Sequence, residues 1–137
     1  MFFYTFLVKP LNLIDTNGSS GVYELVNANG YTQTYGDETF FKFGFYNFVL
    51  FAGYNFTKAS HHFGDSISVM TLTPQHSLKG DLLYALPGKW RIGADYEYKS
   101  SQTLSSGRVT PALWTYGLVI EYTKNQFTLF GNVENYT

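Results

Sequence analysis

Hydrophobic and polar side chains alternate along most of this chain, most clearly between Lys89 and Lys99. The even positions of that stretch are apolar or aromatic, and the odd positions are charged except for Gly93. Successive side chains of a β-strand point to opposite faces. A period of two therefore predicts a strand with one apolar face and one charged face.

The same alternation recurs in other segments, and no helical period is convincing. It predicts an all-β fold, an antiparallel meander of about seven strands at residues 2–8, 39–45, 48–56, 78–86, 89–99, 116–122 and 127–134. Short turns are expected at 46–47, 86–88 and 124–125, and long polar connections at 11–31, 58–69 and 100–111. In an antiparallel meander this order places all the short turns at one end of the sheet.

Turn length also predicts register, because a slip of one residue moves every side chain of a strand to the other face. An odd loop at 86–88 and even loops at 46–47 and 124–125 keep the apolar residues together. The expected pairs are Tyr84 with Trp90, Leu82 with Ile92, Lys79 with Asp95, Tyr122 with Phe127, and Phe45 with Phe48.

The apolar face could meet a soluble core or lipid, and the positions of the aromatic residues favour lipid. Aromatic residues gather near both ends of the strands, with aliphatic residues such as Leu50 and Ala52 between them. From Trp90 to Tyr98 a strand rises about 26 Å, or roughly 20 Å along the bilayer normal at a tilt of about 40°. Two aromatic belts around such an aliphatic band are typical of a transmembrane β-barrel. A lipocalin-like barrel or a β-sandwich is the alternative, because its core would alternate too.

Each face then has an expected environment. The side chains expected to face lipid are Leu82, Tyr84, Trp90, Ile92, Tyr96, Tyr98, Leu118, Ile120, Tyr122, Phe127 and Leu129. Those expected to line a wet lumen are Lys79, Asp81, Lys89, Arg91, Asp95, Glu97, Lys99 and Glu121.

Composition supports this interpretation. Charged residues make up 14% of the chain and aromatic residues 20%, against about 25% charged in typical soluble domains. A net charge of −1 gives no case for nucleic acid, and the absence of cysteine excludes thiolate sites. No apolar run is long enough for a transmembrane helix, and the first residues do not read as a signal peptide. An outer-membrane interpretation therefore requires the chain to be a fragment, residues 1–137 being an incomplete barrel.

Few residues suggest chemistry. Asp95 and Glu97 share a face about 7 Å apart, but they fit a ladder of lumen charges better than an acid/base pair. The metal candidates are His61 and His62 in the connection 58–69, with Asp65 near them. Adjacent histidines rarely converge on one ion without further ligands. We therefore expect no catalytic residue, no cofactor and no metal site.

Several segments resemble the carboxy-terminal part of TonB-dependent outer-membrane receptors. Residues 53–57 resemble a Gly-Tyr-x-Tyr-Thr strand end, and residues 72–76 a Leu-x-Pro-x-His strand entry. Residues 96–102 resemble a strand end with Tyr-x-Ser-x-Gln, and residues 111–116 and 127–135 two of the later strands. The order and spacing of these segments carry the resemblance, from about Asn27 onward.

The resemblance implies a 22-stranded barrel around a plug domain, in the bacterial outer membrane. Such receptors import a scarce nutrient, a siderophore, cobalamin or glycan, with energy that the TonB complex delivers to the plug. The plug, signal peptide and final strand are missing from this chain, and residues 58–69 and 100–108 are expected to face the ligand. The implied partners are outer-membrane lipid, the rest of the barrel, the plug with its TonB complex, and the nutrient. The alternative is a soluble or surface-attached β-domain that binds a ligand or partner, and an enzyme comes third.

Overall fold

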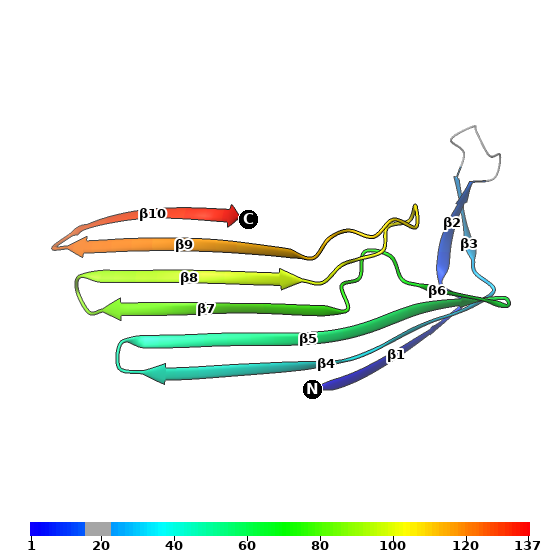
Figure 1. Cartoon of the computed structure of the whole chain (residues 1–137), viewed down its shortest axis with the longest axis horizontal. Coiled ribbons are helices and arrows are strands. Elements are labelled where there is room, and N and C mark those ends of the chain that lie inside the picture. The colour runs from blue at the N-terminus through cyan, green and yellow to red at the C-terminus, as the bar shows by residue number, and fades with distance from the viewer. Residues whose placement is uncertain (16–22) are drawn as a thin grey trace.

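In the computed structural model, which describes residues 1–15 and 23–137, every regular element is a β-strand (Figure 1). An antiparallel meander follows the order β1 (Phe2–Val8), β4 (Gly30–Phe45), β5 (Phe48–Phe63), β7 (His76–Leu86), β8 (Trp90–Lys99), β9 (Leu113–Lys124) and β10 (Phe127–Tyr136). The short strand β6 (Ser66–Val69) pairs with β5, and β2 (Leu11–Asp15) and β3 (Tyr23–Asn27) form a separate hairpin. The predicted all-β meander of about seven strands is confirmed, and the sheet is open.

The short turns gather at one end of the sheet, as predicted, and the longer connections lie at the other end (Figure 1). The turn at Tyr46 and Asn47 has the predicted register, with Phe45 opposite Phe48. The other two predicted registers are wrong by two residues.

Turn chemistry explains both errors. Gly88 has a φ of +70°, and the Lys89 amide donates to the Leu86 carbonyl, so the odd loop is 87–89. Leu86 therefore pairs with Trp90, and Tyr84 pairs with Ile92. Gly is favoured where φ is positive, and the turn closes around it.

The second turn is shifted in the same way. Asn125 has a φ of +55° and begins a two-residue turn with Gln126, so Phe127 pairs with Lys124 and Leu129 pairs with Tyr122. Asn tolerates the left-handed region better than Lys does. Because both shifts are of two residues, the faces of the strands are unchanged.

Two of the predicted long connections contain strands. Strands β4 and β5 are 16 residues long each, and β6 lies inside the segment 58–69. The β2–β3 hairpin occupies part of the segment 11–31, of which residues 16–22 lie outside the described residues. Polarity stops alternating cleanly in these stretches while backbone pairing continues, so a hydrophobic pattern alone does not reveal them.

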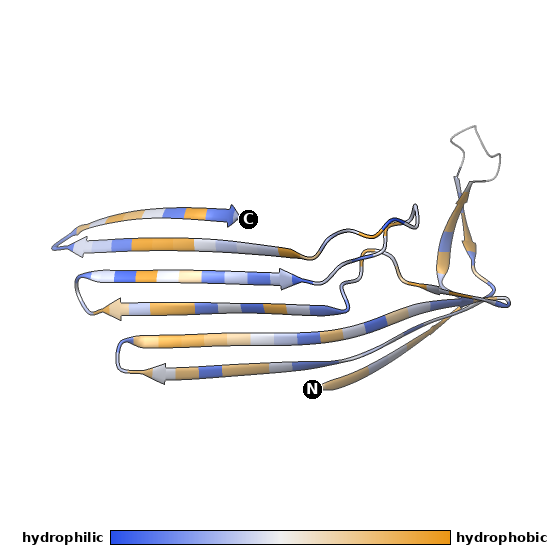
Figure 2. Ribbon diagram, viewed as in Figure 1, coloured by the Kyte–Doolittle hydropathy of each residue, from blue (hydrophilic) through white to orange (hydrophobic). Residues whose placement is uncertain are grey.

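The sheet is a single layer over the residues described. Ala59, 5% exposed, is the buried apolar residue there, and large apolar side chains are exposed throughout the strands. Within the same residues, no helix is long and apolar enough to cross a membrane. Figure 2 shows bands of apolar residues running along the strands of this open sheet.

Candidate functional site

The observed register divides the sheet into two faces. One face, called the apolar face, contains all of the side chains predicted to face lipid: Leu82, Tyr84, Trp90, Ile92, Tyr96, Tyr98, Leu118, Ile120, Tyr122, Phe127 and Leu129. The opposite face, called the polar face, contains the predicted lumen residues Lys79, Asp81, Arg91, Asp95, Glu97, Lys99 and Glu121. Lys89 lies in a turn between strands. The two predicted sets therefore lie on opposite faces of the sheet, and the environment of each face stays a prediction.

The middle of the apolar face is a continuous aliphatic row. Adjacent strands place these residues next to one another in register: Leu50, Leu82, Ala94, Leu118 and Val133. Each comes from a different strand, from β5 to β10. The row is thus a property of the whole sheet, and no single segment produces it.

Aromatic side chains flank this row on both sides. Toward the short turns, the ring centroids of Phe48 and Tyr84 are 4.7 Å apart, and those of Trp90 and Tyr122 are 4.5 Å apart. Toward the long connections, the Tyr98 and Trp114 rings are 4.7 Å apart, and Tyr96 lies next to Tyr116 in register. Two aromatic belts around an aliphatic band are therefore present on this face.

The apolar face is open to its surroundings. Phe43, Leu118 and Leu129 are 53%, 51% and 75% exposed. No other element among residues 1–15 and 23–137 packs over these side chains, because the sheet is a single layer. Contiguous exposed apolar surface is common at sites where proteins contact membranes or other proteins.

The chemistry of this face changes where the strands pass Phe56. The same phase of alternation continues on β5 with Lys58, Ser60 and His62, and β4 brings Gln33 and Tyr35 beside them. Beyond Phe56 the two longest strands therefore present a polar ribbon on this face. Exposed Tyr4 and Phe6 of β1 and Ile67 and Val69 of β6 lie on either side of this ribbon, on the same face.

Two ion pairs lie on the polar face, where Asp81 and Asp95 are also directly opposite each other in register. The Arg91 guanidinium lies 3.4 Å from the Glu121 carboxylate, and the Lys99 ammonium lies 3.1 Å from that of Glu97. Lys79 is opposite Glu97 in register, where we had predicted Asp95. The predicted partner of Lys79 is therefore wrong by two residues. Because these groups are part-exposed, each pair stabilises the sheet by at most about 1 kcal/mol.

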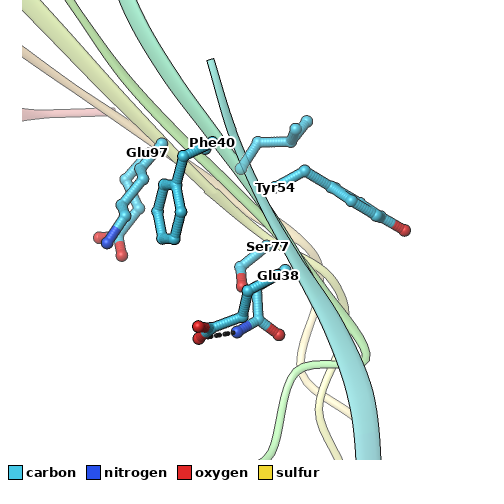
Figure 3. A pocket seen from close by; sticks show the side chains of 9 residues that line it. Glu38, Phe40, Tyr54, Ser77 and Glu97 are labelled. Carbon is cyan, nitrogen blue, oxygen red and sulfur yellow. Dashed lines mark hydrogen bonds between the residues drawn. The ribbon is translucent and has the colours of Figure 1, made fainter. Parts of the chain in front are cut away.

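A shallow recess of about 140 Å³ lies in the middle of the polar face (Figure 3). The Asn55 amide donates to the Glu38 carboxylate at 3.0 Å, and the Lys79 ammonium lies 5.6 Å above the Phe40 ring. Glu97 lies at the opposite side of the recess from Glu38. Such a surface can hold water or polar groups by hydrogen bonds. Ser77 also lines the recess, but among the described residues no histidine lies there to act as a base for its hydroxyl.

The two adjacent histidines do not lie in a loop, contrary to the prediction. Both belong to β5, so their imidazoles lie on opposite faces. His61 is 2.8 Å from the Thr32 hydroxyl on the polar face, and His62 stacks on Tyr31 at 4.4 Å on the other. They cannot share one ion, and no group of three metal-ligating side chains converges within residues 1–15 and 23–137.

His76 begins β7, at the end of the segment 72–76 that resembles a strand entry, and it lies beside Tyr54 and Phe56 of the loop-side aromatic belt. Its Nδ1 lies 2.8 Å from the Tyr54 hydroxyl, and its backbone amide donates a hydrogen bond to Ser100 Oγ at 3.0 Å. The Tyr54 hydroxyl therefore has a polar partner at the border of the apolar band, as amphipathic aromatic residues at membrane interfaces commonly do.

No protein-family model and no curated protein matches the sequence. The arrangement of the two faces is then the main guide to function. Sequence reasoning missed the polar ribbon of Lys58, Ser60 and His62 because it treated this stretch as a loop. Following the phase of alternation past Phe56 would have placed these side chains on one face.

Proposed function

We propose that this chain is part of the wall of an outer-membrane β-barrel, and that the complete protein is a TonB-dependent receptor. In this proposal the apolar face contacts lipid and the polar face lines a water-filled lumen. The receptor would take up a scarce nutrient such as a siderophore, cobalamin or glycan, with energy from the TonB complex. The bacterial outer membrane is the location that follows.

One observation supports the membrane part of the proposal above the others. The aliphatic row of Leu50, Leu82, Ala94, Leu118 and Val133 has aromatic belts on both sides, and all of its members except the half-buried Leu50 are exposed. This order matches the layers of a bilayer, because Trp and Tyr favour the two interfaces and aliphatic side chains favour the hydrocarbon. A soluble core has no physical reason to separate its aromatic side chains in this way.

The open sheet supports a larger barrel. In the described part of the chain, β10 has no partner on its outer side, and residues 39–45 of β4 extend past β1. Unpaired backbone groups cannot remain in hydrocarbon, so further strands must pair with both edges. The TonB-dependent class rests on the sequence resemblance, and the plug, the rest of the barrel and the TonB complex are the partners it implies. This piece would not transport by itself.

Fractionation of cells that express the complete gene product tests the membrane part. We expect the protein in the outer membrane, resistant to extraction by carbonate and released by detergent. Recovery as a soluble monomer would overturn the proposal in favour of a soluble or surface-attached β-domain that binds a ligand or partner.

Loss of nutrient uptake on deletion of the TonB system tests the energy coupling separately. Uptake that persists at the same rate without that system would leave a membrane barrel but remove it from the TonB-dependent class.

A further inference from the structure

The polar ribbon beyond the apolar band forms one wall of a groove, here called the loop-end groove, of about 700 Å³. Its floor comes from β4, β5 and β6, and the connections 70–75 and 100–112 close its other side. Gln33, Tyr35, Ser60 and His62 lie on the same face of the sheet as the aliphatic row, beyond its loop-side aromatic belt. Phe6, Ile67 and Val69 lie beside them on that face. On the proposed function, the groove is then on the outer surface of the barrel, outside the hydrocarbon.

Hydrogen bonds hold the walls of the groove. The Leu72 amide donates to the Thr103 carbonyl at 2.9 Å, which joins the two connections to each other. The Met70 amide donates to the Ala59 carbonyl at 3.0 Å, which joins the first connection to β5. A groove whose walls are tied in this way offers a formed surface to a ligand.

The lining is rich in neutral hydrogen-bonding groups. Hydroxyls come from Ser60, Ser68, Ser101, Thr73 and Thr103, and amides from Gln33 and Gln75. Ile67, Val69 and Val109 add apolar side chains to the same lining. Hydroxyls and amides both donate and accept, so they match ligands that present many hydroxyl groups. The ring of Tyr35 adds a flat apolar surface against which the C–H face of a sugar ring can pack.

Anionic ligands and metal ions fit the groove poorly. Among the described residues of the lining, Lys58 is the one charged side chain, whereas carboxylate and phosphate groups are usually held by several Lys or Arg side chains. Within residues 1–15 and 23–137, His62 is the one imidazole of the lining and no cysteine, aspartate or glutamate accompanies it, so a metal ion would lack ligands there.

We propose that the loop-end groove binds a neutral carbohydrate. This inference rests on the proposed function for the position of the groove outside the membrane. The sugar can come from two sources, a soluble oligosaccharide or the sugar core of lipopolysaccharide in the outer leaflet.

Binding to the complete, detergent-purified protein tests the proposal. The probes are maltohexaose, cellohexaose, lipopolysaccharide with its full sugar core, and lipopolysaccharide lacking that core. We expect at least one sugar-bearing probe to bind, and Tyr35→Ala and Gln33→Ala each to weaken binding by about tenfold, the effect of about 1.4 kcal/mol. Thr34→Ala is the matched control, because Thr34 lies between them on the opposite face of β4, and it should change binding less than about twofold.

The outcomes separate the sources and the two proposals. Binding of a hexaose identifies a soluble sugar, and binding of full-core lipopolysaccharide alone identifies the membrane sugar. Failure of every sugar-bearing probe with protein that fractionates in the outer membrane overturns the carbohydrate site and leaves the proposed function intact. Equal effects of Gln33→Ala and Thr34→Ala on sugar binding would also overturn the site. So would a loss of binding in Lys58→Gln that Tyr35→Ala and Gln33→Ala do not show. Sugar binding by a soluble protein would instead remove the membrane proposal.

Discussion

At the scale of single residues, glycines in the strands make room for large neighbours across the sheet. A Cβ on Gly80 would lie 2.7 Å from Cζ of Tyr96 and 2.8 Å from the carbonyl oxygen of Phe51. A Cβ on Gly117 would overlap the carboxylate of Asp95. The Tyr96 ring thus covers Gly80 on the apolar face, and small and large residues complement each other on both faces. Packing of this kind compensates for the weak strand propensity of glycine.

Gly80→Ala should destabilise the protein by about 1–3 kcal/mol, because the Phe51 carbonyl belongs to the backbone of a neighbouring strand and cannot move freely. Gly44→Ala is the control, since its nearest neighbour, the Phe48 carbonyl oxygen, is 4.0 Å from the added Cβ. Unfolding midpoints in urea with the complete protein in detergent would measure both. Equal midpoints for the two variants would contradict the close packing at Gly80.

Ile92 and Arg91 are neighbours in sequence but lie on opposite faces of β8. Placing an Arg at position 92, or an Ile at position 91, therefore tests which face of β8 contacts lipid. Ile92→Arg should prevent assembly in the membrane, since an Arg near the bilayer midplane costs about 2–4 kcal/mol. Arg91→Ile should be tolerated, because it removes a part-exposed ion pair with Glu121 worth at most about 1 kcal/mol. The yield of membrane-assembled protein is the measurement, and equal losses would refute the facing.

At the scale of strands, alternation predicted the faces better than the registers. A slip of one residue would put Arg91, Asp95 and Glu97 into lipid, at a cost on the order of 10 kcal/mol if the facing is as proposed. A slip of two residues leaves every side chain on its face, so the hydrophobic pattern does not exclude it. Turn conformation decides between such registers, and the positive φ values of Gly88 and Asn125 are visible only in the structure.

Strand periodicity decides which parts of the candidate site can be predicted from the sequence. The apolar and charged faces followed from alternation between Lys89 and Lys99 and its counterparts in other strands. The loop-end groove did not, because it depends on strands whose polarity no longer alternates and on two connections that meet through the bond from Leu72 to Thr103. Contacts between distant segments of this kind leave no periodic signal in a sequence.

The chain contains no cysteine, so a pair of introduced cysteines can report the register of β7 and β8 without competing native thiols. Lys79→Cys with Glu97→Cys should form a disulfide on mild oxidation, because directly opposite Cα atoms lie about 4.5–5.5 Å apart. Lys79→Cys with Asp95→Cys should form it much more slowly, since diagonal neighbours are about 7–8 Å apart. Mass spectrometry of digests gives the yields, and faster cross-linking of the second pair would restore the register we first predicted.

At the scale of the whole molecule, the described sheet lacks a second layer to bury its apolar face. A large apolar side chain contributes about 1.5–3 kcal/mol when fully buried, and a domain is stable by only about 5–15 kcal/mol. With exposed fractions near one half for residues such as Phe43 and Leu118, much of this contribution is still available to a partner. Contact of the apolar face with lipid and pairing of further strands at both edges would together provide this remaining stabilisation.

The chain of residues 1–137, produced by itself, should therefore not stay monomeric in buffer. We expect it to precipitate or form large assemblies in water, because both the apolar face and the unpaired strand edges favour association. In detergent micelles or lipid vesicles the apolar face would be covered, and the chain should stay dispersed with a β-type circular dichroism spectrum. Sedimentation velocity in the two media compares the cases directly. A monodisperse, cooperatively unfolding monomer in buffer would mean that the apolar face closes on itself in solution, and the membrane proposal would then lose its main physical support.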